Sequence, residues 1–138
     1  MTNLIEFTWP VRVYYEDTDA GGVVYYANYL KYLERARTEY LRALGFEQDQ
    51  LKQKDGIIFA VHSLTIKYRK PAIFNDALTV TAEVLDQGNA RLTFKQMITR
   101  KNDNTLICSA DVTIACLDAI KFTPARIPAR VQEVVRGS

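Results

Sequence analysis

The feature that most constrains the fold is a periodic apolar pattern in the first third of the chain. Apolar residues recur at steps of three and four from Tyr26 to Leu44, and Gly45 follows as a stop signal. The positions are Tyr26, Tyr29, Leu30, Leu33, Ala36, Tyr40, Leu41 and Leu44. At 1.5 Å per residue the pattern predicts an amphipathic helix of roughly 28 Å. Its broad apolar face must pack against a second layer.

Most of the remaining sequence is typical of strands. A first strand is predicted at about residues 7–15 and a second in the β-branched and aromatic run Ile57–Tyr68. Alternating apolar residues at 78–84, 92–98 and 106–116 are separated by turn signals, which predicts an antiparallel meander. One long helix and about five antiparallel strands predict an α+β fold in which the sheet wraps the helix. The sheet edges then need cover, which favours a homo-oligomer.

Length and composition limit the class of protein. The 138 residues are 48% hydrophobic, which is enough for a single domain with a buried core. Residues 125–138 are expected to form an edge segment and a loose tail. The net charge of +2 argues against a general nucleic-acid binder. No apolar run approaches the ~20 residues of a membrane span, and no secretory signal is visible, so the expected location is the cytoplasm.

The cysteines and the histidine predict neither a disulfide nor a metal site. Cys108 and Cys116 lie in one predicted strand about 27 Å apart, beyond disulfide reach, and are expected to be small core residues. With His62 as the only histidine, no Cys/His metal cluster can form. His62 is expected to be a partly buried strand residue. No metal and no cofactor are therefore predicted.

The residues that carry chemistry lie in the turn before the predicted helix. Glu16, Asp17 and Asp19 precede paired glycines, and six of the eight tyrosines fall between residues 14 and 32. A helix N-terminus offers unpaired N–H groups that can hold the oxyanion formed when a carbonyl is attacked. A carboxylate beside them can act as nucleophile or base, so one turn supplies both parts of an acyl-transfer site. Spacing alone does not choose among the three acids.

Two other interpretations of this turn compete with an acyl-transfer site. An acid before a helix is most often a capping group. A calcium loop would use Asp17, Asp19 and Gly22 at its first, third and sixth positions. Its twelfth position holds Asn28 in place of the bidentate glutamate, which disfavours metal binding.

The segment from Val13 to Tyr25, VYYEDTDAGGVVY, followed by Asn28-Tyr29 and by Glu34-Arg35-Ala36-Arg37, resembles the hot-dog-fold acyl-CoA thioesterases. Within them it is most similar to the YbgC type associated with the Tol-Pal system, and more distantly to hydroxybenzoyl-CoA thioesterase. The resemblance extends through nearly the whole chain. It implies a helix wrapped by a curved antiparallel sheet, and subunits paired into dimers and commonly tetramers. The implied reaction is hydrolysis of a short-chain, aromatic or other acyl-CoA to the free acid and coenzyme A.

The resemblance also implies roles for individual residues. Asp19 would be the catalytic carboxylate, and the backbone N–H of Tyr26 would polarise the thioester carbonyl. Asp17 would be a structural acid of the turn, and Gly22 would let the backbone approach the substrate. YbgC-type members usually carry a histidine at the position of Tyr26, whereas the hydroxybenzoyl-CoA enzyme has a tyrosine there. The main-chain donor is unaffected by this difference.

Coenzyme A carries phosphates, so the mouth of its pocket should present Lys or Arg. The cations that could serve are Lys67, Arg69, Lys70, Arg91, Lys121 and Arg126. Similarity to the hydroxybenzoyl-CoA enzyme points to Lys121 and the neighbourhood of Arg91, and Arg126 is the third predicted contact. A second lysine that the family often has is replaced here by Thr123.

Two further function classes remain as alternatives. Hydration or dehydration of enoyl thioesters on a hot-dog fold generally uses a paired histidine and acid. His62 is remote in sequence from the acidic turn, which disfavours that reaction. A non-catalytic acyl- or partner-binding module is favoured by the Tol-Pal association of the similar family and disfavoured by the intact acidic turn.

Overall fold

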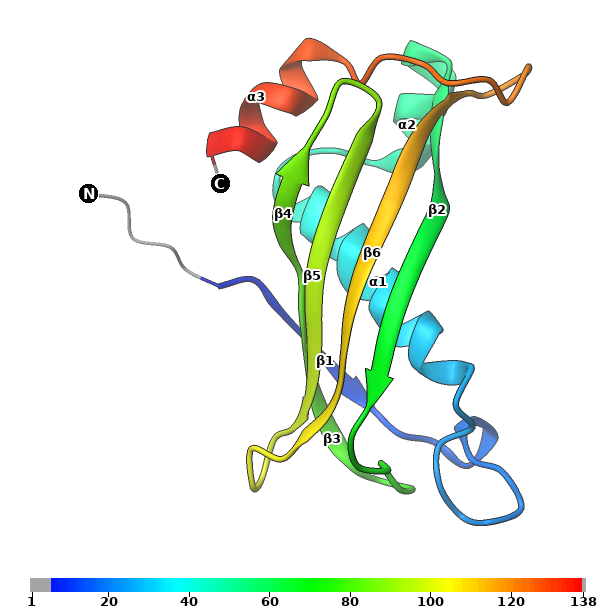
Figure 1. Ribbon diagram of the computed structural model, residues 1–138, viewed down its shortest axis with the longest axis vertical. Helices are drawn as coiled ribbons and strands as arrows, with labels where there is room; N and C mark the ends of the chain where they lie inside the picture. The colour runs from blue at the N-terminus through cyan, green and yellow to red at the C-terminus, as the bar shows by residue number, and fades with distance from the viewer. Residues whose placement is uncertain (1–5, 138) are drawn as a thin grey trace.

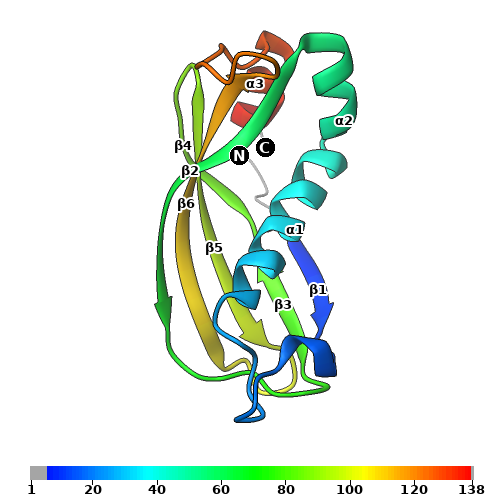
Figure 2. The ribbon, with the colours of Figure 1, turned by 90° about the vertical axis from the view of Figure 1, so that its right-hand side faces the viewer.

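In a computed structural model of the chain, which describes residues 6–137, a six-stranded antiparallel sheet curves around one long helix (Figures 1 and 2). The strands are β1 (Thr8–Arg12), β2 (Ile57–Tyr68), β3 (Ala77–Thr81), β4 (Glu83–Gln87), β5 (Arg91–Arg100) and β6 (Leu106–Asp118). The helical elements are the 3-10 turn η1 (Tyr15–Asp17), α1 (Asn28–Ala43), α2 (Gln48–Gln50), the π-helical turn η2 (Leu51–Asp55) and α3 (Ala129–Gly137). The predicted α+β arrangement of one long helix wrapped by a sheet is confirmed.

The strand order in the sheet is β1-β3-β5-β6-β2, and β4 also pairs with β5. The predicted meander is present in β3 to β6. The strand expected at 78–84 is interrupted at Ala82 and forms two short strands, which gives six strands where about five were predicted. At the other end of the sheet, β2 pairs with β6 alone, so within the described residues the second edge of β2 has no partner strand.

The apolar face of α1 lies on the concave side of the sheet (Figure 2). Leu33, Ala36 and Leu41 of the helix join Phe94 and Ile98 of β5 in one core, and all five are essentially inaccessible to solvent. The periodicity that predicted the helix is therefore also its packing surface. None of the helices within residues 6–137 is long and apolar enough to cross a membrane.

Helix α1 begins two residues later than predicted. The carbonyl of Tyr25 accepts a hydrogen bond from the backbone N–H of Asn28 at 2.8 Å, which closes a turn over residues 25–28 and makes Ala27 the N-cap. Tyr26 therefore belongs to this turn and lies just ahead of the helix. At the other end the prediction is accurate, because Leu44 is the C-cap and Gly45 has a φ of 98°.

Buried hydrogen bonds fix α1 on the sheet. The side-chain amide of Gln96 donates to the carbonyl of Leu33 at 3.0 Å and to that of Thr81 at 3.1 Å. The guanidinium of Arg37 donates to the Oε1 of Gln96 at 3.1 Å, and burial lowers the pKa of Arg37. Because unsatisfied buried polar groups are costly, these bonds hold the helix in one position relative to β3 and β5.

The prediction of a loose tail over residues 125–138 was wrong for the described part of that segment. The chain forms α3 there, and Val131 and Val135 are buried together with Ile127. Their spacing of four residues places them on one side of the chain, against the core. Pro124 and Pro128 led to the prediction of an irregular end. Pro128 in fact stands just before the helix, where proline is tolerated.

Candidate active site

The acidic turn forms a small hairpin ahead of α1. The N–H of Asp19 donates to the carbonyl of Val23 at 2.9 Å, and the N–H of Gly22 donates to the carbonyl of Asp19 at 3.0 Å. Thr18 pairs with Val24 in an isolated antiparallel bridge. Gly22 has a φ of 82°, a conformation that favours glycine. Its backbone conformation alone therefore accounts for this glycine, and its approach to substrate stays a prediction.

The structure distinguishes Asp17 from the other acids, because its groups are used within the turn. Its Oδ2 accepts the N–H of Tyr14 at 2.8 Å. Its carbonyl accepts the N–H of Tyr25 and the side-chain amide of Asn28, each at 2.9 Å. The two carbonyl bonds tie η1 to the entry of α1, and the carboxylate bond holds the start of η1.

Asp19 is exposed, and one of its carboxylate oxygens is free. Its Oδ1 accepts the N–H of Gly21 at 2.8 Å, whereas its Oδ2 has no hydrogen-bond partner within residues 6–137. A side chain at Gly21 would lie 3.2 Å from that Oδ1, so glycine lets the carboxylate fold back onto the turn. Asp19 is thus oriented through one oxygen while the other can react.

Two consecutive backbone N–H groups are unpaired beside this hairpin. The carbonyl of Tyr25 accepts the N–H of Asn28, and the carbonyl of Tyr26 accepts the hydroxyl of Tyr68 at 3.2 Å. The N–H groups at the opposite ends of these two peptide units belong to Tyr26 and Ala27, and neither meets an acceptor in the described part of the chain. Free N–H groups at the start of a helix are suitable donors to an oxyanion.

Tyrosine rings surround these donors. The ring of Tyr26 lies 4.9 Å from that of Tyr25 and 6.3 Å from that of Tyr68, and Tyr68 lies 5.7 Å from Tyr29 (centroid distances). The pKa of Tyr25 is raised, chiefly by Tyr26 and to a smaller extent by the negative charge of Asp19. Tyr26 is 61% exposed, so this surface is open to solvent in a single chain.

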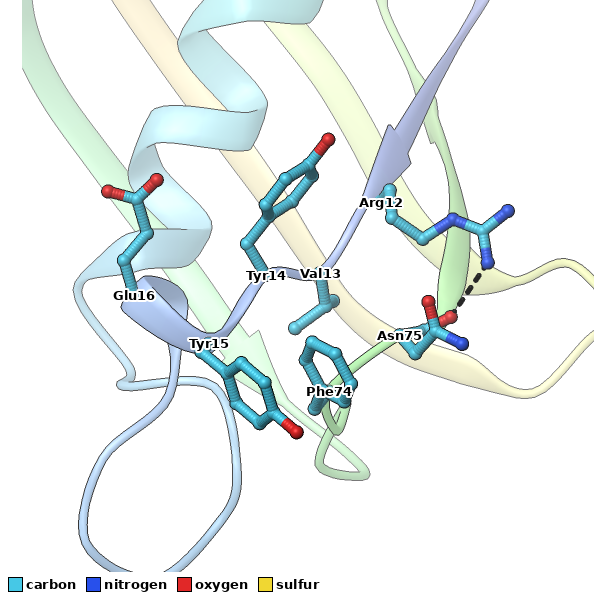
Figure 3. Close-up of a pocket in the computed structure, with 7 residues that line it drawn as sticks. All are labelled: Arg12, Val13, Tyr14, Tyr15, Glu16, Phe74 and Asn75. Carbon is cyan, nitrogen blue, oxygen red and sulfur yellow. Dashed lines mark hydrogen bonds between the residues drawn. The ribbon is translucent and has the colours of Figure 1, made fainter.

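A cavity of about 500 Å³ lies next to this turn, and its wall includes the stacked rings of Tyr15 and Phe74, 3.7 Å apart (Figure 3). The cavity is lined by Arg12, Val13, Tyr14, Tyr15, Glu16, Phe74 and Asn75. Asp19 and Tyr26 line neither this cavity nor three others of similar size within residues 6–137. A single copy of the chain thus displays the predicted catalytic groups on its surface and does not enclose them.

The segments that carry three of the six candidate phosphate-binding cations lie at the end of the sheet opposite the acidic turn (Figure 1). These exposed residues are Arg91, Lys121 and Arg126, whereas the exposed Lys67, Arg69 and Lys70 lie around Tyr68, at the end of β2 next to the acidic turn. The bond from Tyr68 to Tyr26 marks the end of β2 that is next to the acidic turn. The N–H of Ala119 donates to the carbonyl of Gly56 at 2.8 Å, which places the loop after β6 at the other end. The 12 residues of β2 span about 40 Å, so one chain does not bring the first three cations to Asp19.

The other reactive side chains differ in how well they were predicted. His62 lies at a bulge in β2 and is exposed, not partly buried, because an edge strand has a neighbour on only one side. Cys108 and Cys116 are free and buried as predicted, and burial raises the pKa of Cys108 to about 12 and that of Cys116 to about 11. Residues 6–137 contain no group of three or more metal-binding side chains.

Two groups beside the site were missed by sequence reasoning. Tyr68 is 42 positions from Tyr26, so no local pattern connects them. The free N–H of Ala27 depends on where the helix begins, and the apolar periodicity does not define that point. The terminal tyrosine of the predicted strand Ile57–Tyr68 was the available signal for an aromatic group at the strand end.

Comparison with known proteins identifies the family. Residues 13–135 match the thioesterase-like superfamily. The chain belongs to this superfamily. This thioesterase-like chain is 48% identical over 127 residues to the acyl-CoA thioesterase YbgC of Haemophilus influenzae, with 91% of each chain covered. It is 44% identical to the acyl-CoA thioester hydrolase YbgC of Escherichia coli, with 91% of this chain and 92% of the relative covered.

Solved structures agree with this assignment. The DHNA-CoA thioesterase of Staphylococcus aureus superposes with a TM-score of 0.90 at 26% identity, covering 97% of this chain and 91% of that one. The predicted hot-dog fold and the resemblance to YbgC-type thioesterases are both confirmed.

Proposed function

We propose that this thioesterase-like chain hydrolyses acyl-CoA thioesters to a free acid and coenzyme A at Asp19. Its YbgC relatives in Haemophilus influenzae and Escherichia coli, an acyl-CoA thioesterase and an acyl-CoA thioester hydrolase, support the reaction class. The observation that carries the site assignment is a carboxylate with one free oxygen in the hairpin that leads to an unpaired N–H at Tyr26. These are the two groups that acyl transfer requires.

The mechanism follows from these two groups. Asp19 either attacks the thioester carbonyl, forming a mixed anhydride and expelling the thiolate of coenzyme A, or takes a proton from the attacking water. In both routes negative charge develops on the carbonyl oxygen, and the N–H of Tyr26 donates to it. In the first route water then cleaves the anhydride and regenerates Asp19. In the second the thiolate leaves directly from the tetrahedral intermediate, and the proton that Asp19 took from water passes to it.

We further propose that the enzyme is a homodimer joined through the free edge of β2. The register with β6 places Val61, Leu64 and Tyr68 on the same face as Ile114, Val112 and Cys108, which lie in the core. Val61, Leu64 and Tyr68 are nevertheless 50%, 38% and 46% exposed. A long, unpaired strand edge with exposed apolar residues is a surface that soluble proteins usually cover.

Such a dimer would complete the site. Antiparallel pairing of two β2 edges about a twofold axis sets the start of one β2 beside the end of the other. The loop that carries Lys121 is bonded to Gly56 at the start of β2, so it would approach the Asp19 turn of the second copy. Arg91 and Arg126, near the same end, would then face the phosphates of coenzyme A. Pairing of two such dimers would give the tetramer implied by the family.

The proposed setting is one catalytic domain per subunit in the cytoplasm. Both cysteines are buried free thiols, as is usual in proteins of reducing compartments.

Thiol release from a panel of acyl-CoA esters tests the proposed reaction. We expect free coenzyme A to appear with turnover for at least one short-chain or aromatic ester. Loss of the enoyl double bond without thiol release would instead indicate a hydratase. Saturable binding of esters with neither reaction would indicate a non-catalytic module.

A further inference from the structure

We propose that Tyr68 is a positioning residue that holds the free N–H of Ala27 beside the oxyanion donor of Tyr26, through a hydrogen bond to the Tyr26 carbonyl. This inference rests on the proposed function, and it adds a residue from the end of β2 next to the acidic turn to the catalytic arrangement. Tyr68 acts through the backbone of Tyr26.

The contacts of Tyr68 hold its hydroxyl over the entry of α1. Its Oη donates to the carbonyl of Tyr26 at 3.2 Å. Its ring packs edge-on against the ring of Tyr26 and tilted against that of Tyr29. The hydroxyl of Tyr29 in turn accepts the buried N–H of Ala72 at 3.1 Å, which ties it to the segment after β2. The carbonyl of Ala72 accepts the N–H of Val24 at 2.9 Å, so the same segment also holds the hairpin.

The backbone of Tyr26 lies between two peptide units, and each is held at its carbonyl end. The carbonyl of Tyr25 is held by the N–H of Asn28 at 2.8 Å, and the carbonyl of Tyr26 is held by Tyr68. Fixing both peptide planes fixes the φ and ψ of the residue between them. The Asn28 bond thus directs the free N–H of Tyr26, and the Tyr68 bond directs the free N–H of Ala27 beside it, before substrate binds. Such preorganisation is what makes an oxyanion donor effective.

The helix itself does not supply a substitute for the Tyr68 bond. The N–H of Leu30 donates to the carbonyl of Ala27 at 3.2 Å. Within residues 6–137, the carbonyl of Tyr26 therefore accepts a hydrogen bond from Tyr68 alone. Burial raises the pKa of Tyr68, with smaller contributions from Cys108 and Tyr26, so its hydroxyl keeps the proton that it donates. Without this hydroxyl the plane between Tyr26 and Ala27, which carries the Ala27 N–H, would lose that hydrogen bond.

The test compares Tyr68→Phe with the wild-type protein and with Tyr14→Phe. Tyr68→Phe keeps the ring contacts and removes the hydroxyl alone. Tyr14→Phe removes a hydroxyl from an exposed tyrosine whose oxygen makes no hydrogen bond within the described residues. For each protein we would measure kcat and KM by thiol release with the best ester for the wild type, and the unfolding temperature.

We expect Tyr68→Phe to lower kcat by about 10-fold, equal to about 1.4 kcal/mol of transition-state stabilisation, with KM within about twofold of the wild-type value. Tyr14→Phe should leave both constants within about twofold. An unchanged kcat in Tyr68→Phe would overturn the inference. So would a raised KM at constant kcat, because it would mean that the hydroxyl binds substrate directly. Absence of thiol release by the wild type is a different result, which would overturn the proposed function itself.

Discussion

Replacing Asp19 by asparagine is expected to lower kcat for acyl-CoA hydrolysis by about 10³-fold or more. An amide neither attacks the thioester carbonyl nor accepts a proton from water. The asparagine side-chain oxygen can still accept the N–H of Gly21, so the hairpin should keep its shape and the unfolding temperature should stay close to that of the wild type. KM should change little, because the contacts to coenzyme A are made elsewhere. Steady-state thiol release and thermal unfolding check these expectations.

Glu16→Gln is the matched control for Asp19→Asn. Glu16 is an exposed acid in the same turn, and its carboxylate makes no hydrogen bond within residues 6–137. Its neutralisation should leave kcat within about twofold. If Glu16→Gln abolished turnover and Asp19→Asn did not, the catalytic carboxylate would have been assigned to the wrong acid of the turn.

The second large effect is expected from charging the free edge of β2. The double variant Val61→Lys/Leu64→Lys places two cations on the exposed apolar face of that strand. Like charges facing each other across the proposed twofold axis should separate the subunits. Because each site would then lose the cations supplied by the other copy, kcat/KM should fall by at least about 100-fold, which corresponds to about 2.7 kcal/mol. Sedimentation velocity and thiol release on the same sample measure both effects.

Leu85→Lys is the control for the edge variant, since Leu85 is 58% exposed in β4, on the side of β5 away from β6 and β2. It should leave the sedimentation coefficient and kcat/KM unchanged. A fully active monomer of the double variant would contradict the composite site. A double variant that stays dimeric would show that the subunits meet through another surface.

The main elements of the fold could be predicted because each has a strong period. Apolar residues recur at three- and four-residue steps in α1 and at alternate positions in β5 and β6. The same residues that give this local pattern also make the contacts of the core. The misses have local causes: the turn closed by Asn28 shortens α1, and the break at Ala82 divides one strand. The short helical stretch at 48–55 was not predicted, because it has a single buried apolar residue, Leu51.

The site could be predicted only in part. The acidic turn was located correctly next to α1, yet spacing could not separate Asp17 from Asp19. In the structure the carboxylate of Asp17 accepts a hydrogen bond within the turn and that of Asp19 keeps a free oxygen, which supports the proposal that Asp19 is the catalytic acid. The contact of Tyr68 with Tyr26 could not be predicted from local patterns, because the two residues are 42 positions apart in the sequence. Of the predicted cations, Arg91, Lys121 and Arg126 lie at the end of β2 away from the turn, and joining them to it would require a second copy of the chain.

The most direct test of the central claim is a crystal structure of Asp19→Asn with an uncleaved acyl-CoA bound. We predict that the thioester carbonyl oxygen lies about 2.7–3.1 Å from the backbone nitrogen of Tyr26. The side chain at position 19 should face the carbonyl carbon or the water beside it. A thioester bound with its carbonyl turned away from both groups would contradict the account.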